Sequence, residues 1–174
     1  MTEFCETDHC QWLATSVRYF RAAQVLIDSP KFAKDLGLFL PTLQLTAHGL
    51  ELLLKGNLIG TGMSTADVEK FRHDIGALWQ QPDNAHLCDE VRGIAEEVRQ
   101  AAEEAGRWDG GNICTTELLE EQVKNLASLH GSRTNYALRY PSRGLKGPSA
   151  PFLVETFDRT ARLAVGNPTR FSTR

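Results

Sequence analysis

Along most of this chain, the apolar side chains recur every three or four residues, the spacing that puts them on one face of an α-helix. The pattern predicts five substantial helices, at about residues 8–28, 41–59, 84–107, 117–130 and 152–165. Residues 8–28 carry a wide apolar face with Tyr19 and Phe20 on it, and residues 84–107 set such a face against four glutamates. We therefore expect an all-α helical bundle.

The stretches between these helices are shorter and contain more helix-breaking residues. Pro41 is expected at the first position of its helix, where its missing N–H has no helical partner. A short helix from Ser64 or Thr65 and one or two helical turns over 73–81 are expected next, and 31–40 and 131–151 are expected to be connectors. Residues 166–174 are expected to form a loose tail beyond a core of about 8–165.

The composition agrees with five main helices plus a short one in a single domain spanning 1–174. Leu and Ala total 39 residues whereas Val and Ile total 13, a balance that favours helix over strand. The length of 174 residues, with 41% apolar and 24% charged residues, suits one globular domain. The residues expected in the core are Leu50, Leu54, Leu58, Tyr19, Phe20, Val91, Ile94 and Leu126.

Neither a signal peptide nor a transmembrane span is expected. The first ten residues lack a basic and apolar leader, and Glu51 and Lys55 interrupt the longest apolar stretch. We therefore expect a cytoplasmic protein with reduced cysteines and no membrane contact. Cys5, His9 and Cys10 are close in sequence, but no second Cys/His pair completes a zinc motif, so no metal or other cofactor is expected.

The helix over 41–59 is apolar on nearly every side and carries one polar stripe. Gln44, His48, Glu51 and Lys55 recur at helical spacing along it, and Glu51 and Lys55 can form an i,i+4 ion pair. The stripe is either the solvent-exposed face of the helix or a polar seam facing a groove or a dimer partner.

Arg72 and His73 precede the short helical segment over 73–81. A helix N-terminus attracts anions, so the pair is a candidate phosphate contact, with Asp74 as a possible cap. The alternative is that His73 itself caps the helix by hydrogen bonding.

The C-terminal quarter of the chain is basic. Residues 131–174 carry 8 Lys/Arg against 2 Asp/Glu, a balance of +6, whereas residues 1–130 carry 11 against 20, a balance of −9. Within it, Arg139 and Tyr140 lie in a loop that interleaves cations with aromatic rings, a combination that suits phosphates and bases. The alternative is that this segment packs on the acidic helix of its own chain.

Three segments together resemble HEPN domains. Residues 46–56 (TAHGLELLLKG) resemble the second-helix signature of that family, residues 71–78 (FRHDIGAL) resemble its later His-Asp-Leu segment, and residues 18–23 (RYFRAA) fit its first helix. The resemblance covers roughly residues 10–140.

The resemblance implies a helical bundle, usually homodimeric, of the kind common in prokaryotic defence and toxin–antitoxin systems. Many HEPN proteins are metal-independent ribonucleases whose activity depends on an Arg four to six residues before a His. No histidine of this chain has an Arg at that offset; Lys124 precedes His130, but lysine lacks the forked phosphate contact of arginine.

We therefore expect a non-catalytic, homodimeric HEPN-like protein that binds RNA, a nucleotide or a protein partner. The binding groove is expected to be lined by His48, Glu51, Lys55, Arg72, His73, Arg139 and Tyr140. One alternative is a metal-independent ribonuclease with an altered centre, in which His48 or His130 is the base and Arg139 steadies the phosphate. The other is a purely structural subunit.

Overall fold

The computed structural model describes residues 7–34, 36–108, 113–131, 136–138, 147–168 and 170–171. Within these ranges the regular secondary structure is entirely helical, which confirms the expected all-α class. In chain order the elements are α1 (Asp8–Ile27), η1 (Leu36–Leu38), α2 (Phe39–Gly60), α3 (Thr65–Glu69), α4 (Ile75–Trp79), η2 (Pro82–Asn84), α5 (Ala85–Glu104), α6 (Thr115–His130) and α7 (Ala150–Gly166).

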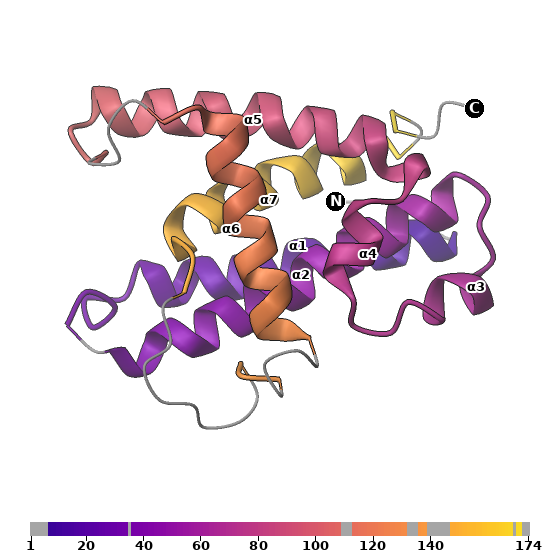
Figure 1. Ribbon diagram of the computed structural model, residues 1–174, viewed down its shortest axis with the longest axis horizontal. Coiled ribbons are helices and arrows are strands. Elements are labelled where there is room, and N and C mark those ends of the chain that lie inside the picture. The colour runs from indigo at the N-terminus through magenta and orange to yellow at the C-terminus, as the bar shows by residue number, and fades with distance from the viewer. Residues whose placement is uncertain are drawn as a thin grey trace.

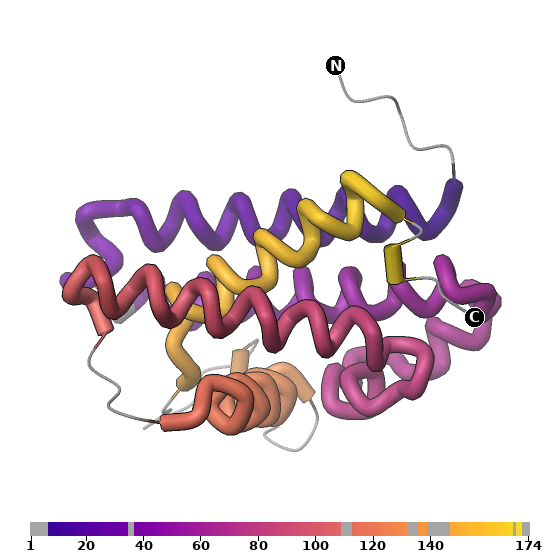
Figure 2. Tube along the Cα trace, turned by 90° about the horizontal axis from the view of Figure 1, so that it is seen from above, coloured from indigo at the N-terminus to yellow at the C-terminus, as the bar shows by residue number. Residues whose placement is uncertain are grey.

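The helices form a bundle around an antiparallel pair. α1 and α2 lie side by side along most of their length, and α7 packs against α1 and α5 (Figures 1 and 2). α6 crosses the long helices and is seen end-on in Figure 2. It contacts α2, α4 and α5. Its last residue, His130, reaches Glu51 near the middle of α2.

The long helices begin and end close to the predicted residues, and the differences have local causes. α2 starts at Phe39 because η1 runs directly into it, so Pro41 is its third residue rather than its first. Proline is tolerated there because the first four N–H groups of a helix have no intrahelical acceptor. The N-cap of α6 is Cys114, so the helix begins at Thr115, two residues before the predicted start.

The buried apolar residues form one continuous cluster. Of the eight predicted core residues, seven are buried, namely Phe20, Leu50, Leu54, Leu58, Val91, Ile94 and Leu126. Tyr19 is only half-buried, because its ring packs edge-on against the half-buried ring of His48, with 4.5 Å between the ring centroids.

α1 and α2 approach each other closely at two glycines of α2. A Cβ on Gly49 would lie 2.8 Å from Phe20 Cε1, and a Cβ on Gly56 would lie 3.0 Å from Trp12 Cβ. Only glycine therefore permits the observed spacing of the two helices.

Side-chain hydrogen bonds tie α2, α4, α5 and α6 together. Asn57 of α2 donates to Asn84 Oδ1 at 2.9 Å, and Asn84 in turn donates to the carbonyl of Leu78 at 2.8 Å. The Trp79 indole and the Arg92 guanidinium both donate to Glu120 of α6. These bonds fix α4 and α6 relative to α2, where the polar stripe lies.

The two ends of the described chain differ from expectation. Cys10 is disulfide-bonded, whereas Cys88 and Cys114 are free thiols, so the expectation of uniformly reduced cysteines is wrong for Cys10. In the predicted loose tail, Arg170 pairs with Glu90 at 3.0 Å and Phe171 is buried, so this part of the tail is held against the bundle. Among the described residues, no helix is long and apolar enough to span a membrane.

Candidate functional site

The polar stripe of α2 leads into a buried cluster centred on one carboxylate. Glu51 is surrounded by Lys55 and His48 of its own helix, by His73 from the turn before α4, and by His130 at the end of α6. We refer to these five residues as the Glu51 cluster.

The two carboxylate oxygens of Glu51 have different partners. Oε1 accepts a hydrogen bond from Lys55 Nζ at 2.8 Å. Oε2 lies 3.0 Å from His73 Nδ1 and 3.0 Å from His130 Nε2. Because an ionised carboxylate can only accept hydrogen bonds, both imidazole nitrogens must carry a proton, which assigns the tautomer of each ring when it is neutral.

Lys55 is held from three sides although its charge is almost completely buried. Besides Glu51, its ammonium donates to the carbonyl of Arg72 and lies 6.0 Å from the centre of the Trp12 ring. The Arg72 carbonyl reaches Lys55 because Arg72 has a positive φ of 51°, which turns the chain between α3 and α4. This turn also places the next residue, His73, against Glu51.

The histidines differ in their access to solvent. The side chain of His130 is fully buried, whereas those of His48 and His73 are 30% and 40% exposed. His48 Nδ1 lies 3.8 Å from Glu51 Oε2, too far for a hydrogen bond but close enough for an ionic contact when the ring is protonated. The cluster therefore has a closed end at His130 and an open end at His48 and His73.

Burial by itself would raise the pKa of the Glu51 carboxyl. The hydrogen bonds from His130, Lys55 and His73, together with the nearby ring of His48, outweigh this effect and hold the pKa far below its ordinary value of 4.5. The surroundings of Glu51 thus favour its ionised form, and Lys55 is its nearest cationic partner.

The start of α4 is capped by a carboxylate. The Asp74 side chain caps this five-residue helix by accepting from the Ala77 N–H at 2.9 Å, so a carboxylate already lies where a phosphate was expected. The alternative expectation, that His73 caps the helix, is also wrong, because its Nδ1 is engaged with Glu51. Asp74 fulfils the capping role predicted for it.

Most of the predicted site residues lie together, although not as an open groove wall. Glu51 and Lys55 are 3% and 5% exposed, so the α2 stripe is a seam facing α6 and the turn before α4 rather than a solvent-exposed face. Arg72 contributes its carbonyl to the cluster, while its side chain is exposed. Arg139 and Tyr140 lie outside the described residues.

His130 belongs to the site although it was absent from the expected binding residues. The helical spacing of its neighbours could have identified it, because the buried face of α6 carries Leu119, Val123, Leu126 and His130. A histidine on an apolar stripe must have a buried partner, and the acidic residue of the α2 stripe is that partner. The His130 side chain is fully buried, whereas the ribonuclease alternative would need its ring to reach a substrate.

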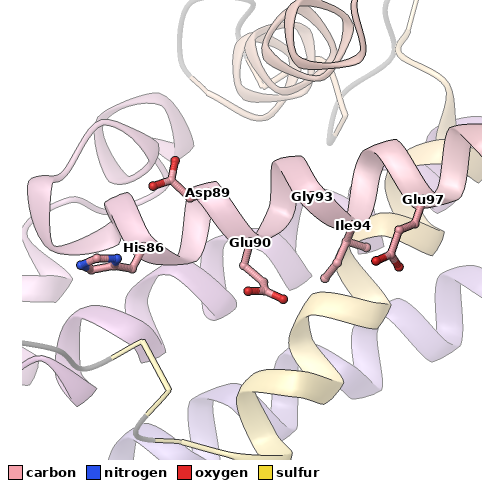
Figure 3. Close-up of a pocket in the computed structure, with 6 residues that line it drawn as sticks. All are labelled: His86, Asp89, Glu90, Gly93, Ile94 and Glu97. Carbon is pink, nitrogen blue, oxygen red and sulfur yellow. The ribbon is translucent and has the colours of Figure 1, made fainter.

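A second feature, a shallow hollow of about 350 Å³, lies along α5 and is separate from the Glu51 cluster. Figure 3 shows its lining, with Asp89, Glu90 and Glu97 projecting from one helix. Arg92 pairs with Asp89 at 2.7 Å, Arg170 with Glu90 at 3.0 Å and Arg159 with Glu97 at 4.0 Å. The acidic groups of the hollow are thus matched by cations of the same chain.

Comparisons of the chain with models of protein families, with curated proteins and with solved structures found no match. The chemistry of the Glu51 cluster is therefore the basis for assigning a function. The cluster can orient an imidazole for proton transfer, present cationic groups at its open end, or hold a metal ion between nitrogen and oxygen ligands.

Proposed function

We propose that the chain is a non-catalytic, homodimeric HEPN-like protein that binds single-stranded RNA through phosphate groups at the open end of the Glu51 cluster. The observation that carries the proposal is the burial pattern of the charges. The Glu51 carboxylate is buried and matched by Lys55, while the guanidinium of Arg72 and the rings of His48 and His73 remain accessible.

An incoming phosphate therefore meets cationic and imidazole groups before it meets Glu51. His73 is held through Nδ1, which leaves Nε2 on the other side of a ring that is 40% exposed. When the ring is protonated, Nε2 donates outward, and Glu51 stabilises the resulting positive charge. Asp74, also exposed, opposes the effect, so we expect the Arg72 guanidinium to supply a necessary part of the attraction.

Binding of a fluorescein-labelled single-stranded RNA, followed by anisotropy over a range of salt concentrations, tests this proposal. Arg72→Ala should weaken binding about fivefold or more and reduce the salt slope by about 0.7, the loss expected for one phosphate contact on a single strand. The control is Arg99→Ala on α5, a half-buried arginine paired with Glu96 at 2.7 Å, and it should bind as the wild type does. Equal losses in both variants, or no binding by the wild type, would refute the proposal.

The dimer requires its own measurement. Light scattering of the purified protein at micromolar concentration should give twice the chain mass of 19.3 kDa. A species of 19.3 kDa alone would contradict the homodimer without affecting the RNA-binding assay.

A second candidate function, RNA cleavage, is favoured by one contact, the 3.0 Å hydrogen bond between His73 Nδ1 and Glu51 Oε2. A buried carboxylate that fixes one ring nitrogen leaves the other as a positioned general base. In that reaction His73 Nε2 takes the proton of a 2′-hydroxyl, O2′ attacks phosphorus, and the departing 5′-oxygen takes a proton from water. The test is incubation of RNA with the protein in EDTA, followed by detection of products with 2′,3′-cyclic phosphate ends. Such products from the wild type but not from His73→Gln would show that the protein cleaves RNA rather than only binding it.

A further inference from the structure

We propose that His48, Glu51 and His130 form a binding site for a zinc ion. Each residue offers one ligand atom, and the three atoms all lie within 4.8 Å of one another. Glu51 Oε2 is the oxygen that faces His48 Nδ1 and His130 Nε2. The proposal shares His48 with the open end of the Glu51 cluster, but it does not depend on RNA binding, because zinc binding is measured without RNA.

The spacing of the ligand atoms fits tetrahedral coordination. Zinc binds imidazole nitrogen and carboxylate oxygen at about 2.0–2.2 Å, so adjacent ligands of a tetrahedral ion are roughly 3.3–3.5 Å apart. Glu51 Oε2 lies 3.0 Å from His130 Nε2 and 3.8 Å from His48 Nδ1, one distance just below that range and one just above it. Side-chain shifts of a few tenths of an ångström would make both distances suitable.

The residue types select the metal. Two imidazoles and one carboxylate form a ligand set that zinc uses with a fourth position left open, whereas magnesium and calcium prefer oxygen ligands alone. The His-x-x-Glu spacing on α2 presents two ligands from one helix face, and α6 supplies the third from across the bundle. Metal sites in helical bundles are built from facing helices in the same way.

The state of His130 supports coordination. Its ring is fully buried and aims Nε2 at Glu51, while its Nδ1 has no hydrogen-bond partner among the described residues. Zinc binding at Nε2 would replace the hydrogen bond to Glu51 by a metal–nitrogen bond and leave the ring proton on Nδ1. Glu51 is also placed as a ligand, because its Oε2 lies 3.8 Å from His48 Nδ1 and 3.0 Å from His130 Nε2.

Lys55 opposes the ion but does not occupy its position. Its ammonium binds Oε1 of Glu51, which leaves Oε2 for the metal, with His73 Nδ1 as a second partner of that oxygen. The excess positive charge favours an anion or a hydroxide as the fourth ligand.

Zinc titration of metal-free protein tests the site, with the exposed thiol removed by Cys114→Ser so that it cannot bind the ion. We expect one zinc per chain by competition with a chromophoric chelator, and cobalt(II) should give the visible absorption of a tetrahedral complex. His48→Gln changes the most exposed ligand and should weaken zinc binding about tenfold or more. His86→Gln on α5 is the control, because His86 is exposed and lies in the separate hollow.

Circular dichroism and thermal melting establish that each variant is folded before its affinity is compared. Zinc should also raise the melting temperature of the parent but not of His48→Gln, because a ligand that binds only the folded state stabilises it. Absence of one-to-one binding at micromolar zinc would overturn the proposal. Equal affinities of the parent and His48→Gln would also overturn it.

Discussion

Glu51 and Lys55, one turn apart on α2, form an ion pair of 2.8 Å in which both side chains are nearly completely buried, at 4% and 7% exposure. Lys55→Met should lower the free energy of unfolding by about 3–5 kcal/mol, because it leaves a buried carboxylate without its cation. Urea denaturation measures the change. The matched control is Lys70→Met, which breaks the exposed pair with Asp67 and should cost about 1 kcal/mol or less.

The double variant Lys55→Met/Glu51→Leu distinguishes the loss of the ion pair from the cost of leaving one buried charge unpaired. We expect it to be less destabilised than Lys55→Met alone, because it removes the unpaired buried charge as well as the pair. If the double variant is at least as unstable as Lys55→Met, the contacts of Glu51 with the histidines contribute more to stability than its contact with Lys55.

The lowered pKa of Glu51 predicts a specific dependence of stability on pH. The folded carboxyl stays ionised below 4.5, where the unfolded carboxyl takes up a proton, so unfolding binds protons and stability falls as the pH falls. Above that pH the contribution is fully present. Between about pH 5 and pH 3, the wild type should therefore lose stability more steeply than Glu51→Gln does.

Other carboxyls also titrate in this range and are the same in both proteins. The pKa of Glu96, for example, is lowered to about 2, mainly by its hydrogen bond with Arg99. Such contributions cancel in the difference between wild type and Glu51→Gln, which isolates Glu51. Parallel pH profiles for the two proteins would contradict the assignment.

Two glycines in long helices should respond in opposite ways to alanine. Gly93→Ala on α5 meets open space and should stabilise the protein by up to about 1 kcal/mol, the difference in helix propensity. Gly49→Ala gains the same propensity but forces its Cβ against the buried ring of Phe20, which itself stacks on Phe157, and we expect a net loss of about 1–3 kcal/mol. Thermal melting of both variants decides whether the α1–α2 contact is as tight as described.

The two free thiols should differ sharply in reactivity. Burial raises the pKa of Cys88 to about 12, whereas Cys114 is exposed at the start of α6. Since the thiolate is the reacting form, iodoacetamide at pH 8 should modify the Cys114 peptide and spare the Cys88 peptide until the protein is unfolded. Early modification of Cys88 would show that α5 opens locally.

Helical periodicity identified the elements because it is a local property of each segment. All five predicted long helices are present, and Ser64 and Asp74 act as the caps that their positions suggested. The same local rule placed His48, Glu51 and Lys55 on one face of α2. It could not say what covers that face, because α6 and the turn before α4 come from distant parts of the chain.

The site was therefore predicted in part. The turn residues Arg72 and His73 were identified, and the structure adds that Asp74 caps the helix start where anion binding was predicted. His130 was considered only as a base, although its place on the apolar stripe of α6 indicated a buried partner. Choosing Glu51 as that partner required the packing of α6 on α2, which spacing alone does not give.

The contact between Glu51 and His130 joins residues 79 positions apart in the chain. Closing so long a loop is slow compared with pairing α1 and α2, which are neighbours in sequence. The Glu51 cluster can therefore be completed only after α6 has docked, late in folding. During synthesis, Glu51 and Lys55 emerge as a local pair well before their third and fourth partners. The complete cluster then exists only in the fully folded protein. A substitution of His130 should therefore change the rate of unfolding far more than the rate of folding.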